Sequence, residues 1–297
     1  MTIVCGIDYS REARDAARCA AALAVRLQLR LILVHSIPPS TPSALHTWPY
    51  PASLDADPVV AAREAARDLA ASTREAIGAP DAAIRIEMGR APERLTAVAD
   101  EHDAAMIVLG THGEGRGRTV LLGSVSLATI RRARRPVVVV PPRVTELAAG
   151  HCLVCGVGDP DDARPARVAA ELAHALDLPL QLAHVAPPQD EDVPGDTVSA
   201  VPLAVPRQPD DRPVIEGHQA LGAAADAVAG VAELDRLRLL AGDPADQLDA
   251  LARREGAALV VVGTRGRGAV RSALLGSVSR RLACRSGAPV VVCSDGA

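Results

Sequence analysis

Short apolar runs alternate along the chain with longer segments in which apolar residues recur every three or four positions. In the first half, the runs rich in β-branched residues are Ile3–Ile7, Leu31–Val34, Ile84–Met88, Met106–Leu109 and Val137–Val140. Runs of this length are typical of strands buried on both faces of a parallel sheet. Equivalent runs occur in the second half, near residues 153–157, 180–185, 234–240, 258–262 and 289–293.

The segments between these runs have the period of amphipathic helices. In the first segment, one stripe at that period contains Ala13, Ala17, Ala20, Ala24 and Leu27. Small residues on the stripe would let the helix lie close to the sheet. Strands and helices that alternate in this way predict an α/β fold, with a parallel sheet, right-handed crossovers and helices on both faces.

The two halves of the chain repeat one another. IVCGID from Ile3 returns as LVCGVG from Leu153, and each half ends in a P-V-V-V run. We therefore predict a first domain at 1–143, a linker at 144–150 and a second domain at 151–297. Each half also has a Pro-rich insertion after its second strand, which is typical of a lid or a disordered segment. Trp48 and Tyr50 lie in the first insertion and could cover a ligand.

Composition narrows the class of protein. A chain of 297 residues with 48% hydrophobic and 23% charged residues is long and apolar enough for two globular domains. Its net charge of −4 gives no general attraction to nucleic acid or to an anionic membrane. The chain opens directly in a strand pattern without a signal-peptide pattern, and no apolar run is long enough to span a bilayer. We expect a cytoplasmic protein with no nucleic-acid or membrane partner.

The cysteine pattern indicates structural thiols. Three of the six cysteines, Cys5, Cys155 and Cys293, lie in strand-like runs, as buried reduced thiols do. Cys152 and Cys155 form a C-x-x-C pair, but an odd separation along a strand directs two side chains to opposite faces. No second pair completes a zinc site, so we predict no metal-binding residues.

One glycine-rich stretch carries candidate chemistry. GTHGEGRGRTVLLGSVS, Gly110–Ser126, returns as GTRGRGAVRSALLGSVS, Gly263–Ser279. Both copies follow a predicted strand and share the spacing G-x-x-G, nine residues, G-S, and in the first copy a helix is expected from about Ser124 to Arg132. Glycines admit a ligand close to the backbone, and Gly-Ser at a helix start offers free amides, a positive dipole end and a hydroxyl. With the further hydroxyl of Ser126, these features suit a polyphosphate.

The stretch differs from the best-known phosphate loops. The Walker A loop needs a lysine, which this chain lacks, and the G-x-G-x-x-G fingerprint belongs after the first strand. Positive charge would come from arginines, which can clamp phosphate bidentately. The candidates are Arg116, Arg118, Arg265, Arg267 and Arg271. If the first and fourth strands are neighbours, Asp8 at the end of the first strand faces this loop. A tight turn explains a single such loop equally well, whereas two matched copies favour a phosphate site.

These residues resemble the universal stress protein family, in particular tandem members with two such domains in one chain. The resemblance rests on VCGIDYS, LVHS, the turns at Gly89 and Gly242, the glycine motif and the P-V-V-V run. It implies two tandem doubly wound sheets of five parallel strands in the order 3-2-1-4-5. It also implies pairing of the two domains within the chain through the last strand, and a homodimer. In the nucleotide-binding branch of the family it implies ATP held by the glycine motif.

The resemblance also implies site residues. The adenine and ribose contacts of the first repeat would be Gly6, Ile7, Asp8 and Ser36. The phosphate contacts would be Gly110, His112, Gly113, Gly123, Ser124, Val125 and Ser126. The contacts of the second repeat would be Val157, Val185, Gly263, Arg265, Gly266, Gly276, Ser277, Val278 and Ser279.

The repeats differ at two positions of the implied site. Asp8 aligns with Gly158, and Asp159 is shifted by one residue, which directs a side chain of an extended chain to the other face. Glu114 stands where the second repeat has Arg267. A carboxylate beside phosphates lowers affinity unless Mg²⁺ bridges the two, so Mg²⁺ joins ATP as an expected cofactor. We expect the first repeat to bind at least as well as the second.

The expected function is that of an ATP-binding stress-response protein, whose occupancy or slow ATP hydrolysis reports energy or stress state to an unidentified protein partner. The alternative is an interaction module of the same fold that binds no nucleotide. An enzyme of the adenine-nucleotide α-hydrolase class is a weaker third candidate, since GIDYS and GVGDP differ from the Ser-Gly-Gly-x-Asp-Ser loop of that class. No catalytic triad can be assembled, and we interpret His35 and His184, at equivalent strand ends, as core histidines.

Overall fold

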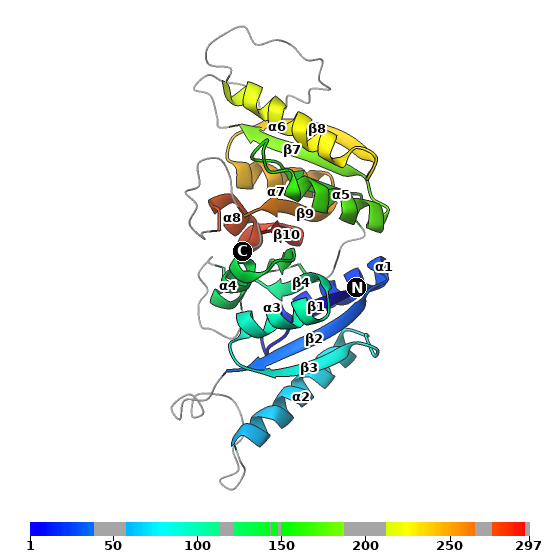
Figure 1. Cartoon of the computed structure of the whole chain (residues 1–297), viewed down its shortest axis with the longest axis vertical. Helices are drawn as coiled ribbons and strands as arrows, with labels where there is room; N and C mark the ends of the chain where they lie inside the picture. The colour runs from blue at the N-terminus through cyan, green and yellow to red at the C-terminus, as the bar shows by residue number, and fades with distance from the viewer. Residues whose placement is uncertain are drawn as a thin grey trace. The chain divides into compact units, whose positions relative to one another are not determined.

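The chain folds into two compact α/β units, one containing residues 1–146 and the other residues 147–295. The computed structural model describes residues 1–38, 58–112, 122–142, 144–145, 147, 150–186, 212–264 and 275–294. Each unit alternates strands with helices along the chain (Figure 1).

The elements of the first unit are β1 (Thr2–Gly6), α1 (Arg11–Leu27), β2 (Arg30–Ile37), α2 (Pro58–Ala76), β3 (Ala83–Met88), α3 (Ala91–Glu101), β4 (Ala104–Gly110), α4 (Ser124–Arg132) and β5 (Val137–Val140). Those of the second unit are β6 (Cys152–Gly156), α5 (Arg164–Leu176), β7 (Leu180–Ala186), α6 (Arg212–Val228), β8 (Leu234–Ala241), α7 (Pro244–Arg254), β9 (Ala257–Gly263), α8 (Ser277–Arg285) and β10 (Val290–Cys293). The strand runs predicted from the sequence are confirmed, and so is the helix predicted from Ser124 to Arg132.

All strand pairs within each unit are parallel. The first unit has the order β3-β2-β1-β4-β5, and the second has the equivalent order β8-β7-β6-β9-β10. Both are the order 3-2-1-4-5, so the predicted fold class is confirmed. The chain runs outward from β1 to β3 and then returns to β4 on the other side of β1. The order of the strands therefore reverses between β1 and β4.

Helices cover both faces of the sheet, as the two last residues of β4 illustrate. The side chain of Leu109 fills the space beside Gly6, where Leu95 of α3 also packs. Gly110, the next residue, is backed by the main chain of Glu12 in α1. Since successive residues of a strand point to opposite faces, α3 and α1 lie on opposite faces of the sheet.

The predicted small-residue stripe of α1 packs on the sheet. Ala17 and Ala20 are fully buried, and Ala13 and Ala24 are nearly so, which allows the close approach that the pattern predicts. Leu27 is only half-buried, and Leu23, which the prediction omitted, is fully buried. The helix begins at an N-cap, Ser10, whose side chain accepts a hydrogen bond from the Ala13 amide at 3.1 Å.

The prediction that every strand is buried on both faces is wrong for β3 and β8. Their residues are mostly half-buried or exposed, whereas β1, β4, β6 and β9 are almost fully buried. The physical reason is position, because β3 and β8 stand at the outer end of the strand order in their units. Arg85 and Arg238 lie in these two strands.

The cysteines behave as structural residues. All six are buried and free of disulfides. Burial raises the pKa of the Cys152 thiol to about 11, and its Sγ lies 3.8 Å from the Glu255 carbonyl oxygen. In the described part of the chain, no group of three His, Cys, Asp or Glu side chains is placed to hold a metal ion. Among the described helices, none combines the length and the apolar character that crossing a membrane would require.

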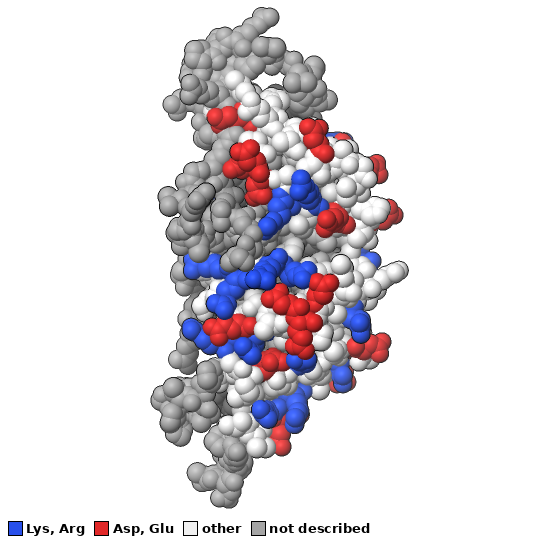
Figure 2. All heavy atoms as spheres, viewed as in Figure 1, with Lys and Arg blue, Asp and Glu red and all other residues white. Residues whose placement is uncertain are grey.

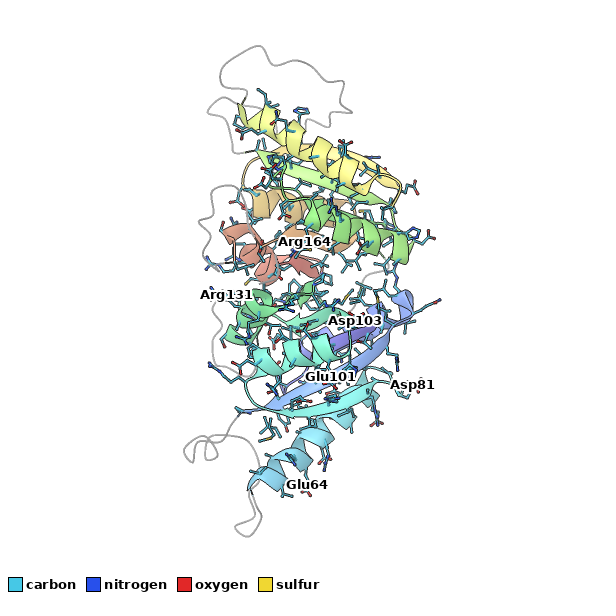
Figure 3. All side chains as sticks on the ribbon, viewed as in Figure 1. Glu64, Asp81, Glu101, Asp103, Arg131 and Arg164 are labelled. Atoms are coloured by element: carbon cyan, nitrogen blue, oxygen red, sulfur yellow. The ribbon has the colours of Figure 1, made fainter. Side chains whose placement is uncertain are left out.

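A buried arginine ties the outer strand of the second unit to α7. Arg238 has a side chain that is 4% exposed and donates to Glu255 at 3.0 Å and to Gln181 at 3.3 Å. Burial opposes ionisation of Glu255, but hydrogen bonds from Gln181 and Arg254 and the charge of Arg238 leave its pKa below the ordinary value. In the first unit, Arg85 pairs in the same way with Glu101 at 3.1 Å, and the side chain of Arg85 is 36% exposed. Glu101 is labelled at the end of α3 in Figure 3.

We expect Arg238→Met to lower the free energy of unfolding by about 2–3 kcal/mol, because Glu255 and Gln181 lose a buried donor. The matched change Arg85→Met should cost about 1 kcal/mol or less, because water competes for an exposed pair. Urea unfolding followed by circular dichroism measures both. Equal effects of the two substitutions would show that burial does not set the strength of these pairs.

Candidate functional site

The carboxyl ends of β2, β1 and β4 meet at one edge of the first sheet. These are neighbouring strands on both sides of the point where strand order reverses, and in open α/β sheets such a point is where ligands bind. The edge brings together the predicted residues Gly6, Ile7, Asp8, Ser36 and Gly110. The neighbouring arrangement of β1 and β4, on which the role of Asp8 was conditional, is therefore present.

The first turn of α4 and the residue before it contact the end of β4. The Gly123 amide donates to the Thr111 carbonyl at 2.8 Å, and the Ser126 hydroxyl donates to the Gly110 carbonyl at 2.7 Å. The Thr111 hydroxyl in turn donates to the Val140 carbonyl at 2.9 Å. These contacts hold the first turn of α4 against the strand. Ser126 is buried, and its hydroxyl hydrogen is used in the bond to Gly110. Only the lone pairs of that hydroxyl oxygen therefore remain for a ligand.

Two glycines of the motif are required by the fold itself. A Cβ on Gly110 would lie 2.8 Å from the main chain of Glu12, and a Cβ on Gly123 would lie 2.9 Å from the Thr111 carbonyl oxygen. Gly123 has φ −59° and ψ 151°, which any residue can adopt. Close approach of the backbone to itself, rather than an unusual dihedral, is therefore the reason for a glycine here.

The N-terminus of α4 presents open amides at this edge. The first hydrogen bond of the helix runs from the Leu127 amide to the Gly123 carbonyl at 2.9 Å, so the amides of Ser124, Val125 and Ser126 have no acceptor within the helix. The cap, Gly123, has no side chain to accept them. Ser124 and Val125 are exposed to solvent. Open amides at the positive end of a helix dipole suit an anionic ligand.

The end of β1 supplies a carboxylate. Asp8 is half-buried, and its Oδ1 accepts a hydrogen bond from the Ser10 amide at 2.8 Å. In the second unit, Asp159 accepts from the Asp161 amide at 3.0 Å. Each carboxylate thus accepts from the amide two residues further along its own chain, which is a local turn of the same kind in both units.

His35 and His184 are core histidines, as predicted. They are 2% and 5% exposed, and their Nδ1 atoms lie 3.0 Å and 2.8 Å from the carbonyl oxygens of Ile7 and Val157. His112, which follows β4, is half-buried, and its Nε2 is buried without a hydrogen-bond partner in the part of the chain that the structure describes.

The end of β2 is joined to the turn after β3. The Ser36 hydroxyl donates to the Gly89 carbonyl at 2.8 Å, and the Gly89 amide donates to the Ile37 carbonyl at 2.9 Å. The side chain of Arg94 lies over Gly89, and its Nε is buried without a partner among the described residues. Sequence reasoning missed Arg94, because nothing in the glycine motif points to a residue of α3.

The second repeat reproduces the loop contacts. The Gly276 amide donates to the Thr264 carbonyl at 2.8 Å, and the Ser279 hydroxyl donates to the Gly263 carbonyl at 2.5 Å. Ser277 is exposed, Val278 and Val185 are half-buried, and Val157 is buried. Where the first repeat has Arg94, the second has Gln247, whose side chain lies in the same way over Gly242.

An ion-pair cluster distinguishes the second repeat. Arg281 of α8 pairs with Asp243 at 2.6 Å and with Asp246 at 2.7 Å, which ties α8 to the start of α7. A hydrogen bond from the Asp246 amide, and also the charge of Arg281, lower the pKa of Asp243. On the face shown in Figure 2, arginines and acidic side chains lie beside one another in each unit.

Several predicted residues lie outside the described part of the chain. Among the implied contacts these are Gly113, Arg265 and Gly266. The other candidates there are Trp48, Tyr50, Glu114, Arg116, Arg118, Arg267 and Arg271.

Comparison with known proteins finds one family along nearly the whole chain. A model described as the universal stress protein family matches residues 1–141 and again residues 151–294. Universal stress protein Rv2623 of Mycobacterium tuberculosis is 30% identical over 304 residues, which is 99% of this chain and 96% of the relative. Universal stress protein Rv2005c of the same organism is 29% identical over 298 residues, covering 98% and 96%. A crystal structure of a universal stress protein from Archaeoglobus fulgidus has a TM-score of 0.66 at 16% identity, covering 99% of this chain and 98% of that one.

Because Gly123 is required by the fold, we expect Gly123→Ala to lower the free energy of unfolding by about 1–3 kcal/mol even without ligand. Gly276→Ala should act alike, since its Cβ would lie 3.0 Å from the Thr264 carbonyl oxygen. Gly222→Ala in α6 is the control, because nothing lies within 4 Å of the added Cβ. That change should be neutral or should stabilise by up to about 1 kcal/mol. Chemical denaturation checks all three, and a Gly123→Ala variant as stable as the control would refute the packing argument.

Proposed function

Because the chain belongs to the universal stress protein family, we propose that it is an ATP-binding regulatory protein. Occupancy of the carboxyl edges of its two sheets would report energy or stress state to a protein partner. Mg²⁺ would be held mainly by the phosphates of ATP, as is usual for this ion. The nucleoside would contact the end of the first strand, and the phosphates would contact the fourth helix of each repeat.

The observation that carries this proposal is the glycine-capped helix N-terminus, found twice. In each repeat, a glycine cap without a side chain precedes a helix whose first amides have no acceptor within the helix. In each repeat, a buried serine braces that first turn against the end of the neighbouring strand. Backbone amides held in this way bind phosphate without a lysine, which the chain lacks.

The nucleoside end of the site rests on Asp8 and Ser36. The Asp8 carboxylate uses one oxygen to accept the Ser10 amide. A carboxylate has about four lone-pair sites, so it retains capacity to accept ribose hydroxyls. The Ser36 hydroxyl donates to Gly89 and keeps its own lone pairs as acceptors. In the second repeat, the carboxylate would come from Asp159, which lies one residue beyond the position that aligns with Asp8. For this reason the first repeat should bind at least as well as the second.

We assign the site a binding role with ATP hydrolysis at most slow. A dedicated hydrolase needs a general base within hydrogen-bond reach of the attacking water. Of the histidines at the described edge of the first sheet, His35 is buried and engaged with the Ile7 carbonyl. Burial also lowers the pKa of His35, against the opposing effects of that carbonyl and of Asp8. Its Nε2 is buried and has no hydrogen-bond partner among the described residues.

One observation favours a second candidate function, an interaction module that binds no nucleotide. Gly110, Gly123 and Gly276 are all required by contacts within the fold, so their presence does not by itself demand a ligand. On this alternative the glycine loops are architectural, and partners recognise the outer surface. The two candidates differ in what happens when the open amides are blocked.

We expect Ser124→Glu to block the phosphate end of the first site without harm to the fold. A carboxylate in the first turn of α4 is favoured by the helix dipole by about 0.3–1 kcal/mol. The same carboxylate repels phosphates, so affinity of that site for Mg·ATP should fall by at least about tenfold. Isothermal titration should show loss of one of two sites in Ser124→Glu, loss of the other in Ser277→Glu, and no binding in the double variant.

The control is Ala97→Glu, which adds the same charge at an exposed position of α3. It should titrate like the parent protein. Ser124→Ala removes the hydroxyl but keeps the amides, and should weaken binding by only about threefold. A parent protein that gives no heat with Mg·ATP, or a double variant that binds as the parent does, would favour the interaction module.

A further inference from the structure

A buried histidine lies near the end of the second strand of each repeat, at an equivalent position. His35 lies on β2, and His184 lies on β7. The Nδ1 of His35 is 3.0 Å from the Ile7 carbonyl oxygen, and the Nδ1 of His184 is 2.8 Å from the Val157 carbonyl oxygen. Because a carbonyl oxygen only accepts, the hydrogen-bond network assigns the proton of each imidazole to Nδ1.

Each of these histidines adds one hydrogen bond between the first two strands of its repeat, beyond the last residue of the first strand. Ile7 follows the last residue of β1, and its amide donates to the Val34 carbonyl at 2.9 Å. Its carbonyl accepts from His35, so both polar groups of Ile7 are held. In the second repeat the Val157 amide donates to the Ala183 carbonyl at 2.8 Å. The side chain of the histidine thus takes the place of a backbone donor that the neighbouring strand does not supply.

The residue held in this way comes directly before the candidate ribose contact. Asp8 follows Ile7 and accepts from the Ser10 amide, and Ser10 caps α1 through the Ala13 amide. The backbone from Ile7 to Ser10 therefore links the hydrogen bond of the His35 ring to the turn at Asp8 and to the cap of α1. Loss of the first bond would free the turn that carries Asp8.

We propose that His35 and His184 are positioning residues for the nucleoside end of the two sites, and that protonation of His35 releases the end of β1 and weakens nucleotide binding. The inference rests on the proposed function, because it concerns the regulation of the same site. Each histidine would act through the backbone that it holds, which is Ile7 for His35 and Val157 for His184.

The surroundings of His35 make its protonation disruptive. Its Nε2 is buried without a partner in the described part of the chain. The ring of Tyr9 packs edge-on against it, with ring centroids 6.1 Å apart and planes at 78°. The Tyr9 hydroxyl donates to the Ala65 carbonyl of α2 at 3.2 Å, and this bond holds the Tyr9 ring beside His35. A proton on Nε2 would create a charged donor with no acceptor, at a cost that movement of the ring can relieve.

The groups around the ring set the direction of the effect. Asp8 is the charged group that acts on His35. On the neighbouring strand β3, the residue in register with His35 is the apolar Ile86. Ala62 and Ala66 of α2 are buried and form an apolar cluster with Ile37 and Ile86. The charged side chains of α2 in this stretch are exposed, namely Arg63, Glu64, Arg67 and Asp68. Glu64 is labelled on α2 in Figure 3.

Burial outweighs the other influences and lowers the pKa of His35 below the ordinary 6.5. The unfolded or released state therefore binds the proton more tightly than the folded state. The contribution of His35 is complete above about pH 6.5 and is lost as the pH falls from there through the lower pKa of the folded state. His184 lies under α6, where a Cβ on Gly217 would be 2.8 Å from its Cδ2.

Two variants separate positioning from titration. In His35→Asn, the carboxamide nitrogen can donate to the Ile7 carbonyl in place of Nδ1, but the side chain does not titrate. In His35→Leu, both the donor and the titration are lost. The full chain carries Ser277→Glu, so that the first site alone reports, and Mg·ATP affinity is measured by isothermal titration from about pH 5 to about pH 8.

We expect the parent to lose about tenfold in affinity on acidification beyond the change seen in His35→Asn. The comparison cancels the protonation of ATP itself, which is common to both proteins. His35→Asn should bind within about threefold of the parent near pH 7.5, and His35→Leu should bind at least about tenfold more weakly across the range. His184→Asn, the matched control, should leave the response of the first site unchanged. A His35→Leu variant that binds as the parent does, or a His35→Asn variant with the full acid response, would overturn the proposal.

Amide hydrogen exchange on the protein without nucleotide keeps the two proposals distinguishable. If ATP does not bind at any pH, the proposed function fails, and the inference is then decided by exchange at Asp8, Tyr9 and Ser10. After correction for the intrinsic pH dependence, their protection should fall below about pH 6.5 in the parent and not in His35→Asn. Protection that is equally insensitive to acid and to His35→Leu would show that His35 does not position this turn.

Discussion

Pairing of β1 with β4 is the contact on which the candidate site depends. Their register places Cys5 beside Val108, so the two strands end side by side. Gly6 has no room for a side chain, because Leu109 would lie 2.5 Å from its Cβ. This pairing brings the turn that carries Asp8 and the end of β4 to the same edge of the sheet. Pairing of β6 with β9 does the same for the second repeat.

Contacts with the end of β4 position the start of α4 and leave its first amides open. Gly123 binds the end of β4 through its own amide, which turns the chain into α4 and leaves the following amides pointing away from any partner in the helix. Ser126 strengthens this arrangement from inside. A glycine is therefore needed at the cap for two reasons. It allows the close approach to Thr111, and it leaves the amides free because a capping side chain would occupy them. Stability and anion binding thus favour the same residue at this position.

Much of the fold and part of the site could be predicted from the sequence. Strand runs and the start of α4 at Ser124 follow from local patterns, and two copies of one pattern reinforce each other. The strand order came from the family resemblance, because periodicity does not say which strands are neighbours. The exposure of β3, the hydrogen bond of His35 and the place of Arg94 over Gly89 depend on contacts between distant segments.

Nucleotide released from the protein tests the central claim most directly. The full chain would be purified rapidly under native conditions, denatured, and its released small molecules identified by mass spectrometry. The account predicts an adenine nucleotide in amounts comparable to the protein, reduced in Ser124→Glu and in Ser277→Glu and absent from the double variant. Release of no adenine nucleotide, together with no heat on titration with Mg·ATP, would contradict it.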